Sequence, residues 1–260
     1  TAVIVHLGAK PVFVDVLKDQ NIDYKKIEKK ITSKTKAIMP VHLTGRVCKM
    51  DEILKISRKY KIDIIEDSAQ SIGSKYNNVY SGSFGKIGCI STHPLKNLNA
   101  SGDGGILITN NKKIYELALT MSNHGLINRD TVKNFGYVSR MDTLQAAILN
   151  FRLNNLETVI KKRRQNAYLY FENIKNNKIL LPIENKKEFN TYHTFVIQTE
   201  HRDRLKKYLA SNGVETAVHY PTPIHLQPAA KKFGYKKNDF KITETQAKNI
   251  LSLPINQFLK

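Results

Sequence analysis

One lysine of this sequence stands in surroundings unlike those of the others. Lys96 lies between Pro94 and a run of Asn, Ser and Gly residues, just ahead of the apolar segment GILITN at 105–110. An amine that attacks a carbonyl must be unprotonated, and burial or a cationic neighbour lowers its pKa accordingly. A loop of small residues at the end of a strand can provide such burial. Lys96 is therefore a candidate nucleophile.

Asp67, Gln70 and Ser91 are the polar residues that belong with Lys96 in this argument. Asp67 ends the apolar run IDIIED at 62–67, far enough before Lys96 for the chain to return on a neighbouring strand. A carboxylate against a pyridine nitrogen keeps that ring protonated, and the protonated ring withdraws electrons from a bound substrate. Taken alone, each residue reads as a surface lysine, a helix cap or a turn residue, so the prediction depends on their combination.

The charge balance is strongly basic. The 260 residues include 42 Lys and Arg against 22 Asp and Glu, which gives a formal net charge of +20. Such a charge suggests a polyanionic partner, but the lysines are scattered and lack the interleaved aromatic residues of a base-stacking surface. We therefore expect no nucleic-acid partner. A basic field would still attract a small anionic substrate.

Neither a membrane segment nor a metal site is expected. No apolar run approaches the roughly 20 residues of a membrane helix, and TAVIVHLGAK lacks the features of a signal peptide, so we expect a soluble, cytoplasmic protein. The two cysteines, Cys48 and Cys89, form neither a disulfide framework nor a CxxC zinc motif. Both are expected to be small buried apolar residues rather than reactive thiols.

Strand and helix patterns alternate along the first half of the chain. Segments 11–16, 36–43 and 62–67 have strand patterns, and Asp23 is expected to cap a helix that reaches Ile31. A helical apolar cluster follows at Met50, Ile53, Leu54 and Ile56. This alternation favours a mostly parallel sheet with helices on both faces, in which ligands bind beyond the carboxyl ends of the strands.

The second half begins with helical patterns and ends in a mixed region. Helices are expected at 112–122 and, as one long element, at 141–174; a strand follows at 191–199, a helix at 203–213 and a strand at 214–221. Segment 173–189 is expected to be a loop. We expect a large domain over residues 1–150 and a linking helix with a smaller domain over 151–260.

Several ordered motifs resemble one protein family. The segments IIEDSAQSIGSKY, GSFGKIGCISTHPLKNLNASGDGGILIT and SRMDTLQAAIL are similar to those of the DegT/DnrJ/EryC1/StrS sugar aminotransferases, which are pyridoxal 5′-phosphate (PLP) enzymes. The similarity continues through PVFVDV, TKAIMPVHLTGR, HYPTPIHLQ and ILSLP, so it covers nearly the whole chain. It implies an α/β, fold type I transferase with a mostly parallel, seven-stranded-type sheet between helices, incomplete here, and a smaller α+β C-terminal domain.

The resemblance also implies an activity and partners. The reaction would move an amino group from an amino acid, L-glutamate being the expected donor, to a keto sugar linked to a nucleotide. It would serve amino-sugar biosynthesis for a surface polysaccharide or a glycosylated metabolite. The family also implies a homodimer with shared active sites.

Residue roles follow from the same resemblance. Lys96 would bind PLP covalently, Asp67 would hold the pyridine nitrogen, Gln70 would contact the side of the ring hydroxyl, and Ser91 would bind the phosphate. The glycines of GDGG at 102–105 would let the backbone pass close to the cofactor. Residues expected near the substrate are His93, by its position beside the lysine, and His219, Tyr220 and His225 in HYPTPIHLQ, for which an ordinary turn is an equal alternative.

Two departures from the family pattern stand out. Val138 occupies the position of an Asn that usually reaches the cofactor phosphate of the neighbouring subunit, so either Ser139 or Arg140 compensates, and Arg140 is the better partner for a dianion. Family members are also about 100 residues longer, mostly before the point where this chain begins. We therefore expect a fragment that lacks the helix start around the phosphate and the aromatic residue that stacks on the ring.

Two other functions remain open on the sequence. A PLP-dependent sugar dehydratase would have the same fold, although a histidine replaces the lysine there, so Lys96 argues against it. A non-catalytic, basic binding or regulatory protein is the other alternative, supported by the charge of +20 and by the incomplete site.

Overall fold

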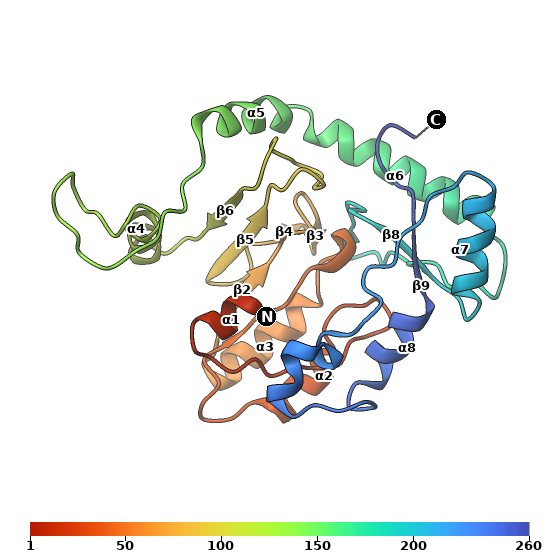
Figure 1. Cartoon of the computed structure of the whole chain (residues 1–260), viewed down its shortest axis with the longest axis horizontal. Coiled ribbons are helices and arrows are strands. Elements are labelled where there is room, and N and C mark those ends of the chain that lie inside the picture. Colours follow the sequence, from red (N-terminus) through yellow and green to blue (C-terminus); the bar gives the residue numbers. More distant parts are fainter. Residues whose placement is uncertain (260) are drawn as a thin grey trace.

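A four-stranded sheet forms the centre of the first half of the chain in the computed structural model, which describes residues 1–259 (Figure 1). Its order is β1 (Ala37–Ile38), β2 (Asp63–Asp67), β5 (Ile87–Ser91) and β6 (Gly105–Ile108). β1 and β5 both run parallel to β2, whereas β6 runs antiparallel to β5. The sheet is thus mostly parallel, as predicted, and the carboxyl ends of β2 and β5 lie side by side.

The helices of the first half are short. They are α1 (Ala2–His6), α2 (Tyr24–Ile27) with the 3₁₀ helix η1 (Glu28–Lys30), η2 (Leu43–Gly45), α3 (Met50–Tyr60) and α4 (Lys112–Met121). Asp23 caps α2 as predicted, because its side chain accepts a hydrogen bond from the Lys25 amide. α3 packs its buried residues Met50, Ile53 and Ile56 with Ile64 of β2, which forms the core of this half.

Four predicted strands are shorter or absent, and the one predicted at 191–199 is reduced to β8 (Phe195–Gln198). Segment 11–16 makes only an isolated bridge between Val16 and Ile22, because Phe13 packs among aromatic rings of the C-terminal half and Asp15 bonds to the start of α8 (Lys241–Asn249). Segment 214–221 makes only the bridge between Ala217 and Ser252. In segment 36–43 the strand ends at Ile38, shortly before Pro40, which has no amide hydrogen to donate.

The long helix predicted over 141–174 is two helices. α5 (Thr143–Leu153) and α6 (Leu156–Asn173) are separated at Asn154 and Asn155 and run along one side of the molecule (Figure 1). Leu149, Leu156 and Ile160 are buried against Leu98 and Ala100 of the loop after β5, whereas Leu153 is exposed. The predicted division between residues 150 and 151 falls inside α5 and stays a prediction.

The C-terminal half combines small sheets and helices. β8 (Phe195–Gln198) pairs antiparallel with β9 (Ile250–Leu253), and β7 (Glu188–Phe189) joins the hairpin of β3 (Lys75–Tyr76) and β4 (Val79–Tyr80). β7 therefore interrupts the loop predicted at 173–189. The remaining helices are α7 (Arg202–Ser211), η3 (Ile224–Leu226), η4 (Pro228–Phe233) and α8. α6 packs on β8 and β9 around Phe195 and Leu251.

Within residues 1–259, no helix has both the length and the apolar character that crossing a membrane requires.

Candidate active site

The loop after β5 fixes the position of Lys96. The backbone amide of Ala100 donates to the Thr92 carbonyl at 2.7 Å, and that of Lys96 donates to the His93 carbonyl at 2.9 Å. The Asn97 side chain donates to the Thr191 carbonyl at 3.1 Å, which ties the loop to the C-terminal half. Asn97 is buried, and its bond to Thr191 holds the neighbouring Lys96 where the two halves of the chain meet. Lys96 itself is half-buried.

Burial and a neighbouring charge shift the pKa of the Lys96 amine. Burial lowers the pKa of its amine, and the charge of Asp67 raises that pKa by less, so the net shift is downward. The charge of Asp67, at the end of β2, therefore acts on Lys96, which lies in the loop after the neighbouring parallel strand β5. A lowered pKa increases the unprotonated fraction that can act as a nucleophile or as a base.

Asp67 is held by its backbone and keeps acceptor capacity in its side chain. Its amide donates to the Pro40 carbonyl at 2.9 Å, and its carbonyl accepts from the His42 amide at 3.0 Å. Oδ1 of Asp67 accepts from the Ala69 amide at 3.1 Å. No ion pair to Asp67 is found among residues 1–259, so Oδ2 can accept a hydrogen bond from a protonated nitrogen of a ligand.

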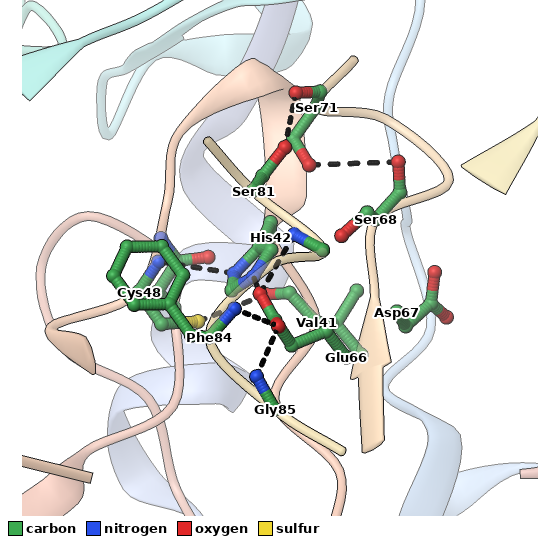
Figure 2. Close-up of polar contacts among 12 residues, drawn as sticks. Val41, His42, Cys48, Glu66, Asp67, Ser68, Ser71, Ser81, Phe84 and Gly85 are labelled. Atoms are coloured by element: carbon green, nitrogen blue, oxygen red, sulfur yellow. Dashed lines mark hydrogen bonds and ion pairs between the residues drawn. The ribbon is translucent and has the colours of Figure 1, made fainter. Parts of the chain in front are cut away.

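A buried network lies behind Asp67, on the other side of β2. The Glu66 carboxylate accepts hydrogen bonds from the amides of Gly82, Phe84 and Gly85 at 2.8, 2.7 and 2.6 Å. It also pairs with Nε2 of His42 at 2.8 Å, and both side chains are fully buried. Figure 2 shows Glu66 pointing toward His42 while Asp67 points away. Glu66 therefore anchors the turn at 82–85 to the strand that carries Asp67.

Gln70 and Ser91 each use one hydrogen-bonding group within the protein. Oε1 of Gln70 accepts from the Thr44 amide at 2.8 Å, which leaves its side-chain NH₂ group as a donor. Oγ of Ser91, at the end of β5, accepts from the His93 amide at 3.3 Å, so its hydroxyl hydrogen is available to an anion. Both residues are half-buried; Gln70 lies on the loop that follows β2, and Ser91 is the last residue of β5.

The GDGG segment passes close to the lysine loop. A Cβ atom on Gly104 would lie 2.5 Å from Oγ1 of the buried Thr92, which is closer than real side chains come. The Thr92 amide also donates to the Gly104 carbonyl at 2.9 Å. Glycine is therefore required at 104 for the backbone to lie against the loop that carries Lys96.

The three residues of HYPTPIHLQ that were predicted near the substrate, His219, Tyr220 and His225, differ in burial and in their partners. His219 is half-buried, bonds through Nδ1 to the Ser252 hydroxyl at 3.0 Å, and its pKa is lowered by burial and by the charge of Lys96. It also lines a cavity of about 450 Å³ beside Tyr220, which is exposed. His225 is buried and pairs with Glu244 at 3.0 Å, so the structure does not bring its side chain together with Lys96.

The remaining predicted residues lie at the margin of the site. His93 is half-buried, accepts through Nδ1 from the Leu95 amide, and has Nε2 at 4.0 Å from Asp103. Arg140 is exposed in the segment before α5, and no hydrogen bond or ion pair to it is found within residues 1–259. Its guanidinium is thus available to an anion or to a second chain.

His193 and Arg163 belong to this neighbourhood, although the sequence did not indicate them. Burial and the charges of Lys96, Arg163 and His219 lower the pKa of His193 to about 3. Arg163 is buried in α6 and donates to the Tyr192 and His193 carbonyls at 3.0 and 3.2 Å. The fold brings these two residues together from separate segments of the chain, which no local sequence pattern reveals.

One cysteine differs from the prediction. Cys48 is buried, and burial raises the pKa of its thiol, whereas Cys89 in β5 is exposed. Cys89 pairs in the sheet with Leu107, which is 43% exposed, so this part of the sheet face is uncovered. The prediction of two buried cysteines was wrong for Cys89.

Comparisons with known proteins agree with this arrangement. A relative from Geobacillus stearothermophilus, named a pleiotropic regulatory protein, is 39% identical over 99% of this chain and 70% of its own. The dTDP-3-amino-3,6-dideoxy-alpha-D-galactopyranose transaminase of Aneurinibacillus thermoaerophilus is 40% identical over 96% of this chain and 68% of its own.

The crystal structure of DesV from S. venezuelae superposes with a TM-score of 0.97 and 32% sequence identity, covering 100% of this chain and 70% of that one. The family profile described as DegT/DnrJ/EryC1/StrS aminotransferase matches residues 1–260. With Asp67 at the end of β2 and Lys96 in the loop after the neighbouring parallel strand β5, this chain belongs to the DegT/DnrJ/EryC1/StrS aminotransferase family.

Proposed function

We propose that the protein transfers an amino group from an amino acid, L-glutamate, to a keto sugar linked to a nucleotide. The observation that carries this proposal is the half-buried Lys96 amine, whose pKa is lowered by burial and raised by less by the charge of Asp67. Its relatives include a transaminase named for a dTDP-linked amino sugar. The net charge of +20 also favours anionic substrates such as sugar nucleotides.

The residues around Lys96 fit PLP, the cofactor of this family's aminotransferases. Oδ2 of Asp67 can accept a hydrogen bond from the protonated pyridine nitrogen, and the Gln70 NH₂ group can donate one to the ring hydroxyl. Buried hydroxyls without a hydrogen-bond partner within residues 1–259, those of Ser68 and Thr92, lie next to these residues in the chain. When bound, PLP supplies an electron-withdrawing ring that stabilises negative charge at the substrate carbon.

Lys96 would have two tasks in the reaction. Its unprotonated amine binds the cofactor, and after release the same amine takes a proton from the substrate and returns it. Asp67 would keep the ring protonated, because a carboxylate beside the ring nitrogen favours the charged form. Ser91 would hold the phosphate, with Arg140 as the cationic contributor that compensates for Val138.

The proposal is tested with protein produced from its full reading frame. Wild-type protein mixed with PLP should develop the near-visible absorbance of a lysine-bound cofactor and should form 2-oxoglutarate from glutamate when a keto sugar nucleotide is present. Lys96→Ala should lose both signals, whereas Lys113→Ala, which alters an exposed lysine of α4, should keep both. Absence of the absorbance in the wild type, or its persistence in Lys96→Ala, would refute the proposal.

We also propose that the protein acts as a homodimer. Large apolar side chains are exposed along the segment from α4 to α5, and Arg140 lies within it. Exposed fractions are 97% for Phe135 and 72% for Phe151, which is unusual unless another surface covers them. Light scattering should give twice the chain mass, and the double variant Phe135→Ser, Phe151→Ser should shift that mass toward the monomer. A monomeric wild type would contradict the proposal.

A regulatory role is a second candidate, because a 39% identical relative is named a regulatory protein and the chain is strongly basic. This role predicts binding to random DNA that weakens steeply with salt, together with no uptake of PLP. The same full-length protein decides between the two functions.

A further inference from the structure

Thr191, in the segment before β8, uses all of its hydrogen-bonding groups within the protein. Its backbone amide donates to the Gly45 carbonyl at 3.0 Å, and its hydroxyl bonds with the Ser74 hydroxyl at 2.8 Å. Its carbonyl accepts from the Asn97 side chain at 3.1 Å. Thr191 and Ser74 are fully buried, and Asn97 is buried as well. Three segments that are distant in the sequence therefore meet at one residue.

The pair of hydroxyls has one consistent arrangement of hydrogens. Oγ of Ser74 donates to the Gly45 carbonyl at 2.7 Å, which uses the only hydrogen of that hydroxyl. The Thr191 hydroxyl must therefore donate to Oγ of Ser74. The Gly45 carbonyl accepts from both residues and is thus fixed from two directions.

The turn at Gly45 also holds Gln70. The amide of Thr44, the residue before Gly45, donates to Oε1 of Gln70 at 2.8 Å. Gly45 has a φ of +91°, and a Cβ atom on it would lie 2.8 Å from two backbone amide nitrogens of segment 191–193. Because no space separates the turn from this segment, a displacement of one displaces the other. The position of Gln70 is therefore coupled to that of segment 191–193.

Asn97 joins the lysine loop to the same segment. Leu98 and Ala100 of this loop are buried against apolar side chains of α5 and α6. Such contacts keep the loop packed but have no preferred direction, whereas the hydrogen bond of Asn97 is directional. Because Asn97 follows Lys96 directly, its bond determines where the lysine lies relative to the turn that holds Gln70.

The Asn97 side chain has a cost for folding. Its Oδ1 is buried and has no hydrogen-bond partner within residues 1–259. An unpaired buried polar atom costs folding free energy, so native structures keep few of them. A leucine of similar volume would remove this cost and extend the apolar contacts of Leu98. Stability alone therefore does not explain an asparagine at this position.

We propose that Asn97 is a positioning residue for the amino transfer. Its hydrogen bond to Thr191 holds the loop of Lys96 at a fixed place relative to Gln70, so that both side chains reach one cofactor. Asn97 acts through the backbone of the loop, because its NH₂ group is used by Thr191. This inference rests on the roles proposed above for Lys96 and Gln70 toward PLP.

Two substitutions of Asn97 test the effect on the reaction. Asn97→Leu removes the donor at similar volume, and Asn97→Asp replaces it with an acceptor of the same shape. In protein produced from its full reading frame, both should lower kcat about 10- to 100-fold with KM changed by less than about threefold, because a small displacement of the reacting amine slows the reaction more than it weakens binding. Asn173→Leu is the matched control and should keep both constants, since Asn173 donates at 2.8 Å to a carbonyl of its own helix at an exposed position.

Melting and hydrogen exchange of the cofactor-free protein separate positioning from folding. Asn97→Leu should melt within about 4 °C of the wild type, because the lost bond to Thr191 is offset by the removal of the unpaired Oδ1. The backbone amides of Lys96 and Ala100, which bond within the loop, should exchange at least about tenfold faster in this variant. The amides of β8 and β9 should keep their wild-type rates.

The inference is overturned if the loop amides of Asn97→Leu exchange at the wild-type rate, or if both variants keep the wild-type kcat. It is also overturned if Asn97→Leu fails to fold or exchanges faster throughout the chain, since the bond would then serve the fold. The exchange readout needs neither cofactor nor activity, so it decides the contact even where the proposed function fails. Failure of the function itself is seen separately, as activity that survives Lys96→Ala.

Discussion

Replacing Glu66 by glutamine is the sharpest test of the scaffold behind the site. The two side chains have nearly the same shape, so the change exchanges one acceptor oxygen for a donor NH₂ group and little else. In the native network each carboxylate oxygen accepts two N–H groups: Oε1 accepts from Phe84 and Gly85, and Oε2 accepts from Gly82 and His42. The network contains only donors around Glu66 (Figure 2).

The magnitude follows from this geometry. Whichever way the glutamine amide is turned, its NH₂ group faces two N–H donors. His42 cannot relieve the conflict by changing its tautomer, because its Nδ1 accepts from the Cys48 amide at 3.2 Å. Two buried donors therefore lose their acceptor, at about 1–3 kcal/mol each. We expect the free energy of unfolding to fall by about 3–5 kcal/mol, a large part of the 5–15 kcal/mol typical of a whole domain.

Urea unfolding of wild-type and Glu66→Gln protein measures this difference. Glu52→Gln is the matched control, because Glu52 makes an exposed ion pair with Lys55 in α3 and should change the free energy of unfolding by less than about 0.5 kcal/mol. A Glu66→Gln protein within about 1 kcal/mol of the wild type would refute the reasoning that all four donors depend on this carboxylate.

Two further variants test other contacts. For Asp15, burial raises the pKa, but hydrogen bonds from Thr243 and Lys26 outweigh it, and the net pKa lies below 3.8. The ionised Asp15 therefore stabilises the fold above about pH 3.8, and this stabilisation is lost as the pH falls through the folded-state pKa. Asp15→Asn should lower the free energy of unfolding in urea at about pH 7 and much less at about pH 3. An equal loss at both pH values would contradict this. Gly104→Ala should weaken PLP uptake, measured by absorbance, because the new Cβ meets Thr92 Oγ1; adding Thr92→Ala should recover part of the loss, and strictly additive losses would show that this contact is not the cause.

Local sequence patterns were sufficient to predict features that a single strand or turn determines. The apolar run before Asp67 and the small residues around Lys96 predicted two strand ends with adjacent polar groups, and the structure has them on β2 and β5. The cap at Asp23 likewise depends only on the amide of Lys25, two residues further along the chain. Such features are visible in sequence because the residues that make them are neighbours.

Features that depend on distant segments were not predictable. Segment 191–199 has the composition of a strand throughout, but β8 begins only at Phe195, because Thr191 bonds to Gly45. This irregular start leaves the Thr191 carbonyl outside the sheet, where it accepts from the Asn97 side chain at 3.1 Å. Segment 11–16 likewise has a strand pattern, yet its Asp15 side chain caps the start of α8, where it accepts from the Thr243 amide at 3.0 Å. In each case tertiary contacts prevailed over a local β preference.

Glu66 and Asp67 show how one strand can separate stability from chemistry. Successive side chains of a strand point to opposite faces, so adjacent carboxylates meet entirely different surroundings. Glu66 is fully buried and accepts four hydrogen bonds, whereas Asp67 is half-buried and accepts one. A substitution of Asp67 should therefore alter PLP binding with little effect on folding, while Glu66 can be changed only at the expense of the fold. The hydrogen bonds of Glu66 to the turn at 82–85 hold β2 in place without any ligand. Because these bonds stabilise the strand, the Asp67 carboxylate on its opposite face can remain incompletely paired.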